Sequence, residues 1–333
     1  MRARPPATAP IAGVAAALCL AALAHAQETT VRPAPGVPRT AWGTPDLQGT
    51  WTGSTITPLE RPKEYVNKPV LTPQEAAALE ARARARNATE PPAVAGDPGT
   101  YNQIWFDPSS AVVPDRRTSL IVDPPDGRIP FTPRGRELAK RSSDHYGTGP
   151  RDSHFDLDTG ERCLTDGMPI PYWTGYNNNY QIVQTRDHLV VFGEMYHNLR
   201  VIALDGRSRT GVPRWLGESR GRWDGETLIV ETDSFADKSG YWWATSWRAA
   251  RPTLRMVERF TRIDAETIDY EFTMEDPEAF THPWTARIPL TTNQAARGVT
   301  EGRLFEYACH EGNYSLVDVL RGARMKEQAE SAR

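Results

Sequence analysis

The chain has 333 residues, with 39 Lys and Arg against 42 Asp and Glu, which gives a formal net charge of −3 at pH 7. Charges of both signs are spread along the sequence and form no basic stripe, so we expect no nucleic acid partner. The 10 Trp and 28 Pro residues are typical of a loop-rich β protein with an aromatic interior and argue against a helical bundle.

The first 26 residues have the layout of a secretory signal peptide. A basic start is followed by a short apolar run, Ile11 to Leu23, and by the cleavage motif Ala24-His25-Ala26. This run is too short to span a bilayer, and no later segment is long and apolar enough. We therefore expect a periplasmic or secreted protein without a membrane span. Residues 27–41 are expected to form an extended, Pro-rich leader.

Export changes the interpretation of the cysteines. Removal of the signal peptide would leave Cys163 and Cys309, an even pair in an oxidising compartment, so we expect a disulfide between them. Two buried free thiols are the alternative. A metal site that uses Cys309 and the adjacent His310 is a third reading, although no C-x-x-C spacing supports it. We expect no metal and no other cofactor.

Residues 42–150 contain few long apolar runs, so we expect them to wrap the rest of the chain. The segment Thr72-Pro-Gln-Glu75 predicts a helix start with a capping box, and the Ala- and Arg-rich run to Arg86 continues that helix. Two apolar runs within Ser119–Phe131 flank a DPPDG sequence, which predicts a hairpin with a wide turn. Arg134–Arg141 is a candidate for a short helix.

The pattern becomes strongly β from Tyr180 onward, where short apolar runs alternate with polar residues and turns. It predicts strands at Gln181–Thr185, Leu189–Phe192, Leu199–Leu204, Arg220–Trp223, Thr227–Thr232, Leu254–Arg262, Thr267–Glu275 and Trp284–Thr291. Asp205-Gly206 and Asp224-Gly225 are typical of tight hairpin turns. A last segment, Asn313 to Glu327, predicts a helix capped by Asn313 with an apolar side.

Two strands indicate which side chains face inward. In Thr267–Glu275, apolar residues alternate with polar ones, as in an antiparallel sheet with one buried and one exposed face. In Leu254–Arg262 the same alternation places Glu258 among apolar neighbours. A desolvated carboxyl there would be poised to act as a base, or it would pair with an arginine such as Arg287.

So many short strands in series predict a closed or nearly closed barrel within residues 151–333, because closure removes exposed strand edges. Gly49-Thr-Trp51 and Gly221-Arg-Trp223 both resemble the G-x-W of lipocalin-like barrels. The expected fold is therefore mainly β: an antiparallel lipocalin-like barrel with an irregular N-terminal wrap, one N-terminal helix and a C-terminal helix. Stretches such as WLGESRGRWDGETLIVET and ACHEGNYS also resemble exported bacterial proteins without an assigned activity. This resemblance implies export and a single architecture, and it implies no catalytic roles.

The densest group of ionisable residues follows the expected strand Leu189–Phe192. Glu194, Tyr196 and His197 are candidates for acid–base catalysis, and Arg200 is a candidate for holding an anionic substrate. On one extended strand, Glu194, Tyr196 and Arg200 would share a face, with His197 opposite unless the strand breaks at Asn198. The alternative is an ion-paired strand edge with a surface histidine.

Further candidates for substrate binding are polar or aromatic residues near strand ends: Asn179, Trp223, Glu258, His282, Trp284 and His310. Asn179 belongs to three consecutive Asn whose amides suit a sugar or a carboxylate, although such a run is also typical of a plain turn. His282 and Trp284 lie where a barrel mouth is expected. A Cys163–Cys309 bridge would hold His310 close to it.

The sequence contains no H-E-x-x-H, G-x-S-x-G, phosphate-binding loop or dinucleotide motif, which argues against the enzyme classes that use them. Two functions remain. The favoured one is a cofactor-independent lyase, isomerase or hydratase acting on a small polar or saccharide substrate. The alternative is an exported lipocalin-like protein that binds a small molecule without catalysis. Convergence of Glu194, Tyr196, His197 and Arg200 in one pocket would favour the enzyme, whereas side chains pointing to solvent would favour binding.

Overall fold

The computed structural model describes residues 36–89, 109–165, 167–171, 176, 178–237, 251–293, 304–309 and 314–332. The expected signal peptide and most of the leader lie outside these residues, as do His310 and Asn313. Within the described residues, no helix combines the length and apolarity needed to cross a membrane.

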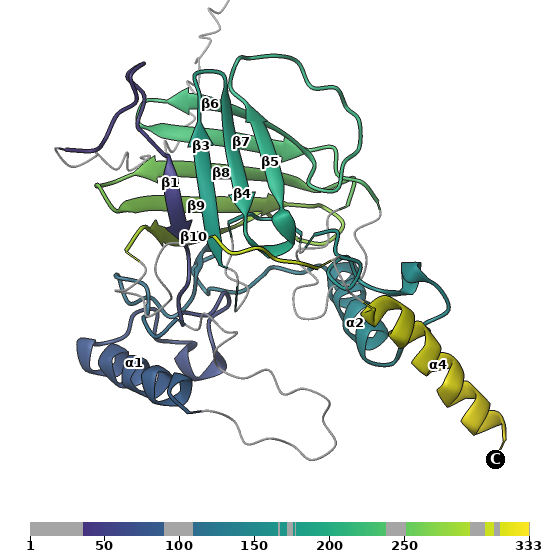
Figure 1. The fold of residues 1–333 in the computed structure, drawn as a ribbon. Helices are drawn as coiled ribbons and strands as arrows, with labels where there is room; N and C mark the ends of the chain where they lie inside the picture. The colour runs from purple at the N-terminus through teal and green to yellow at the C-terminus, as the bar shows by residue number, and fades with distance from the viewer. Residues whose placement is uncertain are drawn as a thin grey trace, which may run out of the picture. The chain divides into compact units, whose positions relative to one another are not determined.

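Ten strands of the described chain form one sheet, and the pairing of β1 with both β3 and β10 closes all of them except β2 into a barrel (Figure 1). The strands are β1 (Gly49–Thr52), β2 (Ile121–Asp123), β3 (Asn179–Gln184), β4 (His188–Gly193), β5 (Leu199–Ala203), β6 (Glu218–Asp224), β7 (Thr227–Asp233), β8 (Arg255–Arg262), β9 (Thr267–Glu275) and β10 (Trp284–Thr291). The mainly β fold and the barrel are confirmed. Each expected strand forms, with its ends shifted by at most two residues.

The barrel is not purely antiparallel, and this part of the expectation is wrong. β5 and β6 run parallel and meet through a single pair, Ala203 with Arg220. Asp205-Gly206 therefore begins a long connection instead of the expected hairpin. Asp224-Gly225 does form its hairpin, between the antiparallel strands β6 and β7.

A buried carboxylate organises the connection between β5 and β6. Glu218 accepts hydrogen bonds from the backbone N–H groups of Thr210 (2.8 Å) and Gly211 (3.0 Å). Burial by itself raises the pKa of Glu218, but these bonds, the Thr210 hydroxyl and the charge of Arg220 lower it to about 2. The crossover is thus fixed by a charged group at the start of β6.

Both G-x-W motifs lie on barrel strands. Trp51 is fully buried, and its indole N–H donates to the carbonyl oxygen of Leu47 (3.0 Å). Gly221 faces inward, where a Cβ would come within 2.5 Å of a methyl group of Leu204. Trp223 is half-buried and packs against the core. The glycine at 221 therefore leaves room for the chain at the end of β5.

The described strands enclose a packed core. The four apolar side chains of β9 that were expected to share a face are all fully buried: Ile268, Tyr270, Phe272 and Met274. Large side chains from other strands join them, among them Trp51, Phe260 and Trp284. Aromatic and branched residues thus fill the inside of the barrel.

Three α-helices occur in the described chain, two of them between the barrel strands β1 and β3. α1 (Pro73–Asn87) begins with the expected capping box, in which the Thr72 side chain accepts from the backbone N–H of Glu75 and the Glu75 carboxylate accepts from that of Thr72. α2 (Pro133–Thr148) is twice the expected length and is capped by Thr132. α4 (Ser315–Ser331) confirms the C-terminal helix, although Tyr314 stands at its cap position.

The hairpin expected within Ser119–Phe131 does not form. β2 instead pairs with β10, where Ile121 lies opposite Ala286. Phe131 forms an isolated bridge with Phe280. Both runs therefore pair with distant parts of the barrel instead of with each other.

Candidate binding site

The connection between β4 and β5 turns sharply instead of continuing as one strand. After Gly193 the chain forms a 3-10 turn, η4 (Met195–His197). Tyr196 and His197 both adopt left-handed backbone conformations, with φ of 53° and 51°. Such angles are uncommon outside glycine, and each costs roughly 1–3 kcal/mol, so they persist only where the surrounding structure enforces them. The expectation that Glu194, Tyr196 and Arg200 share one strand face is wrong.

Glu194 is buried below this turn. Its carboxylate accepts hydrogen bonds from the side-chain amide of Asn179 (3.0 Å) and from the backbone N–H of Phe305. The backbone N–H of Glu194 in turn donates to the carbonyl oxygen of Asn179 (3.0 Å). Asn179 is itself buried. The two predicted residues thus join β3, the turn and the segment 304–309.

Aromatic rings gather on the outer side of the turn. The ring of Tyr196 meets that of Tyr307 edge-on at 4.9 Å between centroids, and the His197 ring lies 6.4 Å from Tyr307. His197 is exposed, whereas Tyr196 and Tyr307 are half-buried. We call Tyr196, His197 and Tyr307, with Glu194 beneath them, the aromatic turn site.

Tyr307 was not among the residues predicted from the sequence. It belongs to the short segment 304–309, which forms neither helix nor strand. The signal that could have found it is its position two residues before Cys309, because a disulfide at Cys309 fixes the neighbouring chain.

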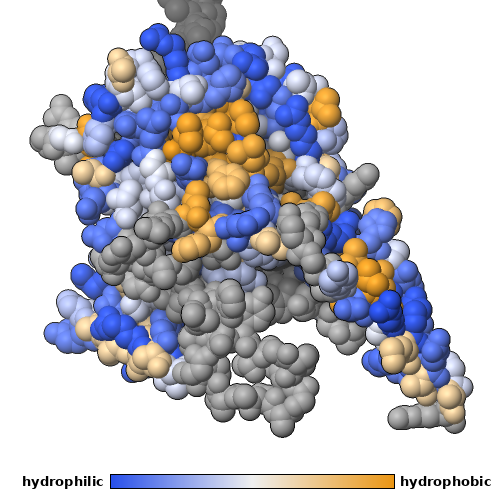
Figure 2. Space-filling model, in the orientation of Figure 1, coloured by the Kyte–Doolittle hydropathy of each residue, from blue (hydrophilic) through white to orange (hydrophobic). Residues whose placement is uncertain are grey.

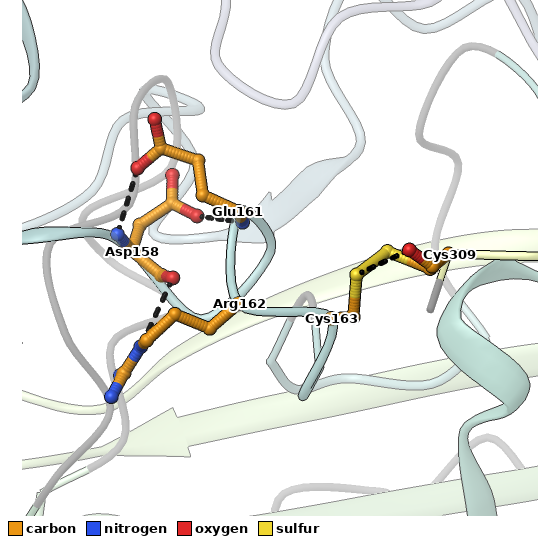
Figure 3. Close-up of a disulfide and its surroundings, with 5 residues drawn as sticks. All are labelled: Asp158, Glu161, Arg162, Cys163 and Cys309. Atoms are coloured by element: carbon orange, nitrogen blue, oxygen red, sulfur yellow. Dashed lines mark hydrogen bonds between the residues drawn. A yellow bond between two sulfur atoms is a disulfide. The ribbon is translucent and has the colours of Figure 1, made fainter. Parts of the chain in front are cut away.

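The disulfide between Cys163 and Cys309 is confirmed, with 5.7 Å between the two Cα atoms (Figure 3). The backbone N–H of Cys309 donates to the carbonyl oxygen of Tyr307 (2.8 Å). The bridge therefore anchors the segment that presents Tyr307 to the turn.

A buried carboxyl lies in the loop that leads to Cys163 (Figure 3). The Asp158 side chain accepts from the backbone N–H of Glu161 (2.7 Å), and the Glu161 side chain accepts from that of Asp158 (2.9 Å). Burial, reinforced by the charge of Glu161 and opposed by the backbone hydrogen bonds, raises the pKa of Asp158 to about 6. No sequence pattern singled out this residue.

We predict that Asp158→Asn stabilises the protein at pH 7 by about 1–3 kcal/mol and has little effect at pH 4. With its pKa raised to about 6, Asp158 is favourable when protonated, and that stability is lost as pH rises through 6. Asn keeps the acceptor for Glu161 and removes the charge. Urea unfolding of both proteins at the two pH values measures the difference. An equal difference at both would contradict the assignment.

Arg200 is not part of the aromatic turn site. It is buried in the barrel interior, where its guanidinium forms two hydrogen bonds with the Glu258 carboxylate (2.6 and 2.9 Å). Ser219 and Thr232 accept further bonds from it, and the Tyr270 hydroxyl donates to Glu258 (2.8 Å). Burial raises the pKa of Tyr270 well above its ordinary value, so this phenol stays protonated.

Glu258 pairs with Arg200 and not with Arg287, which was the arginine expected. The inward position of Glu258 is confirmed, since its side chain is fully buried. Arg287, however, pairs with Asp269 at 2.5 Å. Arg200, expected to hold a substrate, and Glu258, expected to act as a base, therefore form an ion pair with each other.

The remaining predicted residues do not converge on the turn. Trp284 is fully buried and packs edge-on against Phe272 and Phe280, at 5.7 and 5.8 Å between ring centroids. His282 is exposed, with its ring next to the carbonyl oxygen of Pro283. Within the described part of the chain, no group of three or more His, Cys, Asp or Glu is placed to hold a metal ion.

Comparison with known proteins finds no significant match. No family model matches the chain, and neither curated proteins nor solved structures do.

Proposed function

We propose that this chain is an exported protein that binds a small molecule, a saccharide or an aromatic acid, at the aromatic turn site. One observation carries the proposal: the four residues expected to form a catalytic group are divided between the turn, where His197 is exposed, and the barrel interior, where Arg200 is buried. Export is supported by the signal-like start of the sequence and by the disulfide.

The chemistry of the turn suits recognition of a ring. Tyr and His offer flat apolar faces together with a polar tip that can donate or accept a hydrogen bond. Tyr196 and His197 hold left-handed backbone angles, a form of strain that gathers at ligand sites. The edge-on contact of Tyr196 with Tyr307 orients both rings.

Catalysis by the predicted group is less well supported. Glu194 accepts two hydrogen bonds from Asn179 and one from Phe305, so both of its carboxylate oxygens are engaged within the protein. Arg200 is engaged by Glu258, so its charge does not serve a substrate at the turn. A ligand inside the barrel is likewise disfavoured, because the described strands enclose packed aromatic and branched side chains.

The test is a calorimetric titration of the mature chain with methyl β-glucoside and, separately, with benzoate. Tyr307→Ala and His197→Ala should each weaken binding of the active probe by about ten-fold or more, because few contacts carry most of the energy of such sites. Glu271→Gln, on the outer face of β9, is the control and should change nothing. If Tyr307→Ala and His197→Ala bind the probe as tightly as this control does, the proposal is overturned. Turnover of a probe would favour the lyase or isomerase instead.

A further inference from the structure

The outer face of β3, β4 and β5 carries five apolar side chains in two rows, next to the exposed Gln181 of β3. Val183, Val190 and Val201 lie opposite one another in register across the three strands, and Phe192 lies opposite Leu199 in the next row. Val183, Val201 and Leu199 are 43%, 54% and 55% exposed. Figure 2 shows this apolar surface over the three strands. We call these five side chains the apolar face.

Other outward faces of the barrel are charged. On β8, Arg255 forms ion pairs with Glu231 of β7 (3.2 Å) and with Glu275 of β9 (3.4 Å). On β10, Arg287 pairs with Asp269. An exposed sheet face is expected to be polar, so the apolar face is a local exception that indicates a contact surface.

The apolar face borders the aromatic turn site. Phe192 stands two residues before Glu194, and Leu199 stands two residues after His197. The row formed by Phe192 and Leu199 is therefore the row nearest the turn. Phe305, whose backbone bonds to Glu194, is itself 58% exposed. The aromatic turn site and the apolar face are therefore adjacent along β4 and β5.

The size of the face indicates what covers it. Three strands about 4.8 Å apart, with two rows about 7 Å apart, cover roughly 200 Å² in projection. A stable contact between two protein chains needs about 800 Å² from each. A second copy of this chain would therefore gain too little here, whereas a single aliphatic chain would fit.

We propose that the ligand is an amphiphile whose polar or aromatic head lies at the aromatic turn site and whose aliphatic tail lies on the apolar face. This inference rests on the proposed function and adds the chemical class of the ligand. The tail would cross the register rows formed by Val183, Val190 and Val201 and by Phe192 and Leu199.

The experiment compares heads with and without a tail: methyl against octyl β-glucoside, and benzoate against 4-octylbenzoate, all below their micelle concentrations. The octyl compound should bind at least about ten-fold more tightly, because each buried methylene contributes favourably. Val201→Ser and Leu199→Ser should remove that preference and leave binding of the short probe unchanged. Val212→Ser is the matched control, since Val212 is exposed to a similar degree, 55%, in the connection after β5.

The outcomes separate the two proposals. Equal affinity for short and octyl probes, with Tyr307→Ala still weakening both, overturns the amphiphile and leaves the aromatic turn site in place. If Val201→Ser weakens binding of the octyl compound but Tyr307→Ala does not, the aromatic turn site and the two-part ligand are both overturned. A preference for the octyl compound that survives Val201→Ser and Leu199→Ser would overturn the assignment of the tail to this face.

Discussion

Glu258→Gln is expected to lower the free energy of unfolding by about 3–5 kcal/mol, because it leaves a buried guanidinium without its counter-charge. Arg200 and Glu258 are both fully enclosed, and the carboxylate also accepts the Tyr270 hydroxyl. Urea unfolding with linear extrapolation measures the loss. The double variant Arg200→Met with Glu258→Leu should regain most of it, because apolar residues of similar volume can replace a buried pair.

Arg255→Met provides the control for this experiment. Its ion pairs lie on the outer face of β8, where each contributes about 1 kcal/mol or less. A Glu258→Gln protein as stable as wild type that lost ligand binding would contradict a structural role. The pair would then have to be placed in the functional site.

Trp284→Ala should cost about 3–5 kcal/mol of stability, because it empties the space of a fully buried indole between Phe272 and Phe280. Trp284→Phe should lose less, since a ring remains in contact with both neighbours. Thermal and urea unfolding measure both variants. His282→Ala, at an exposed position next to the strand, should stay within about 0.5 kcal/mol of wild type.

This prediction separates two roles of one residue. A Trp284 that lined a ligand site would lose binding on substitution while the fold stayed largely intact. Unfolding curves that coincide for Trp284→Ala and wild type would contradict the core assignment.

Local patterns in the sequence predicted local structure well. The alternation around Tyr270 set the inward face of β9, and Thr72 with Glu75 set the start of α1. Prediction from local sequence fails where one motif, here Asp-Gly, occurs in two different structures. Asp224-Gly225 closes a hairpin and Asp205-Gly206 does not, because the strand after Asp205-Gly206 pairs in parallel. That choice depends on partners distant in the sequence.

The candidate site could be predicted only in part, because some of its contacts also join residues distant in the sequence. The cysteine pair could be matched because only two cysteines remain after the expected cleavage. The inward position of Glu258 followed from alternation, but its partner Arg200 stands 58 residues away on another strand. The sharp turn at Tyr196 required left-handed angles that residue type does not favour. The approach of Tyr307 to that turn depends on the tertiary fold.

The disulfide has a mechanical consequence. It joins residues 146 apart in the sequence, and β3 through β10 all lie between them. β1, which completes the closed barrel by pairing with β3 and β10, comes from outside this covalent ring. Tension applied to the two ends of the chain would therefore bypass the ring and act on the elements outside it, β1 among them. Detaching that one strand would open the barrel while the other strands stayed tethered in a loop that cannot be drawn out.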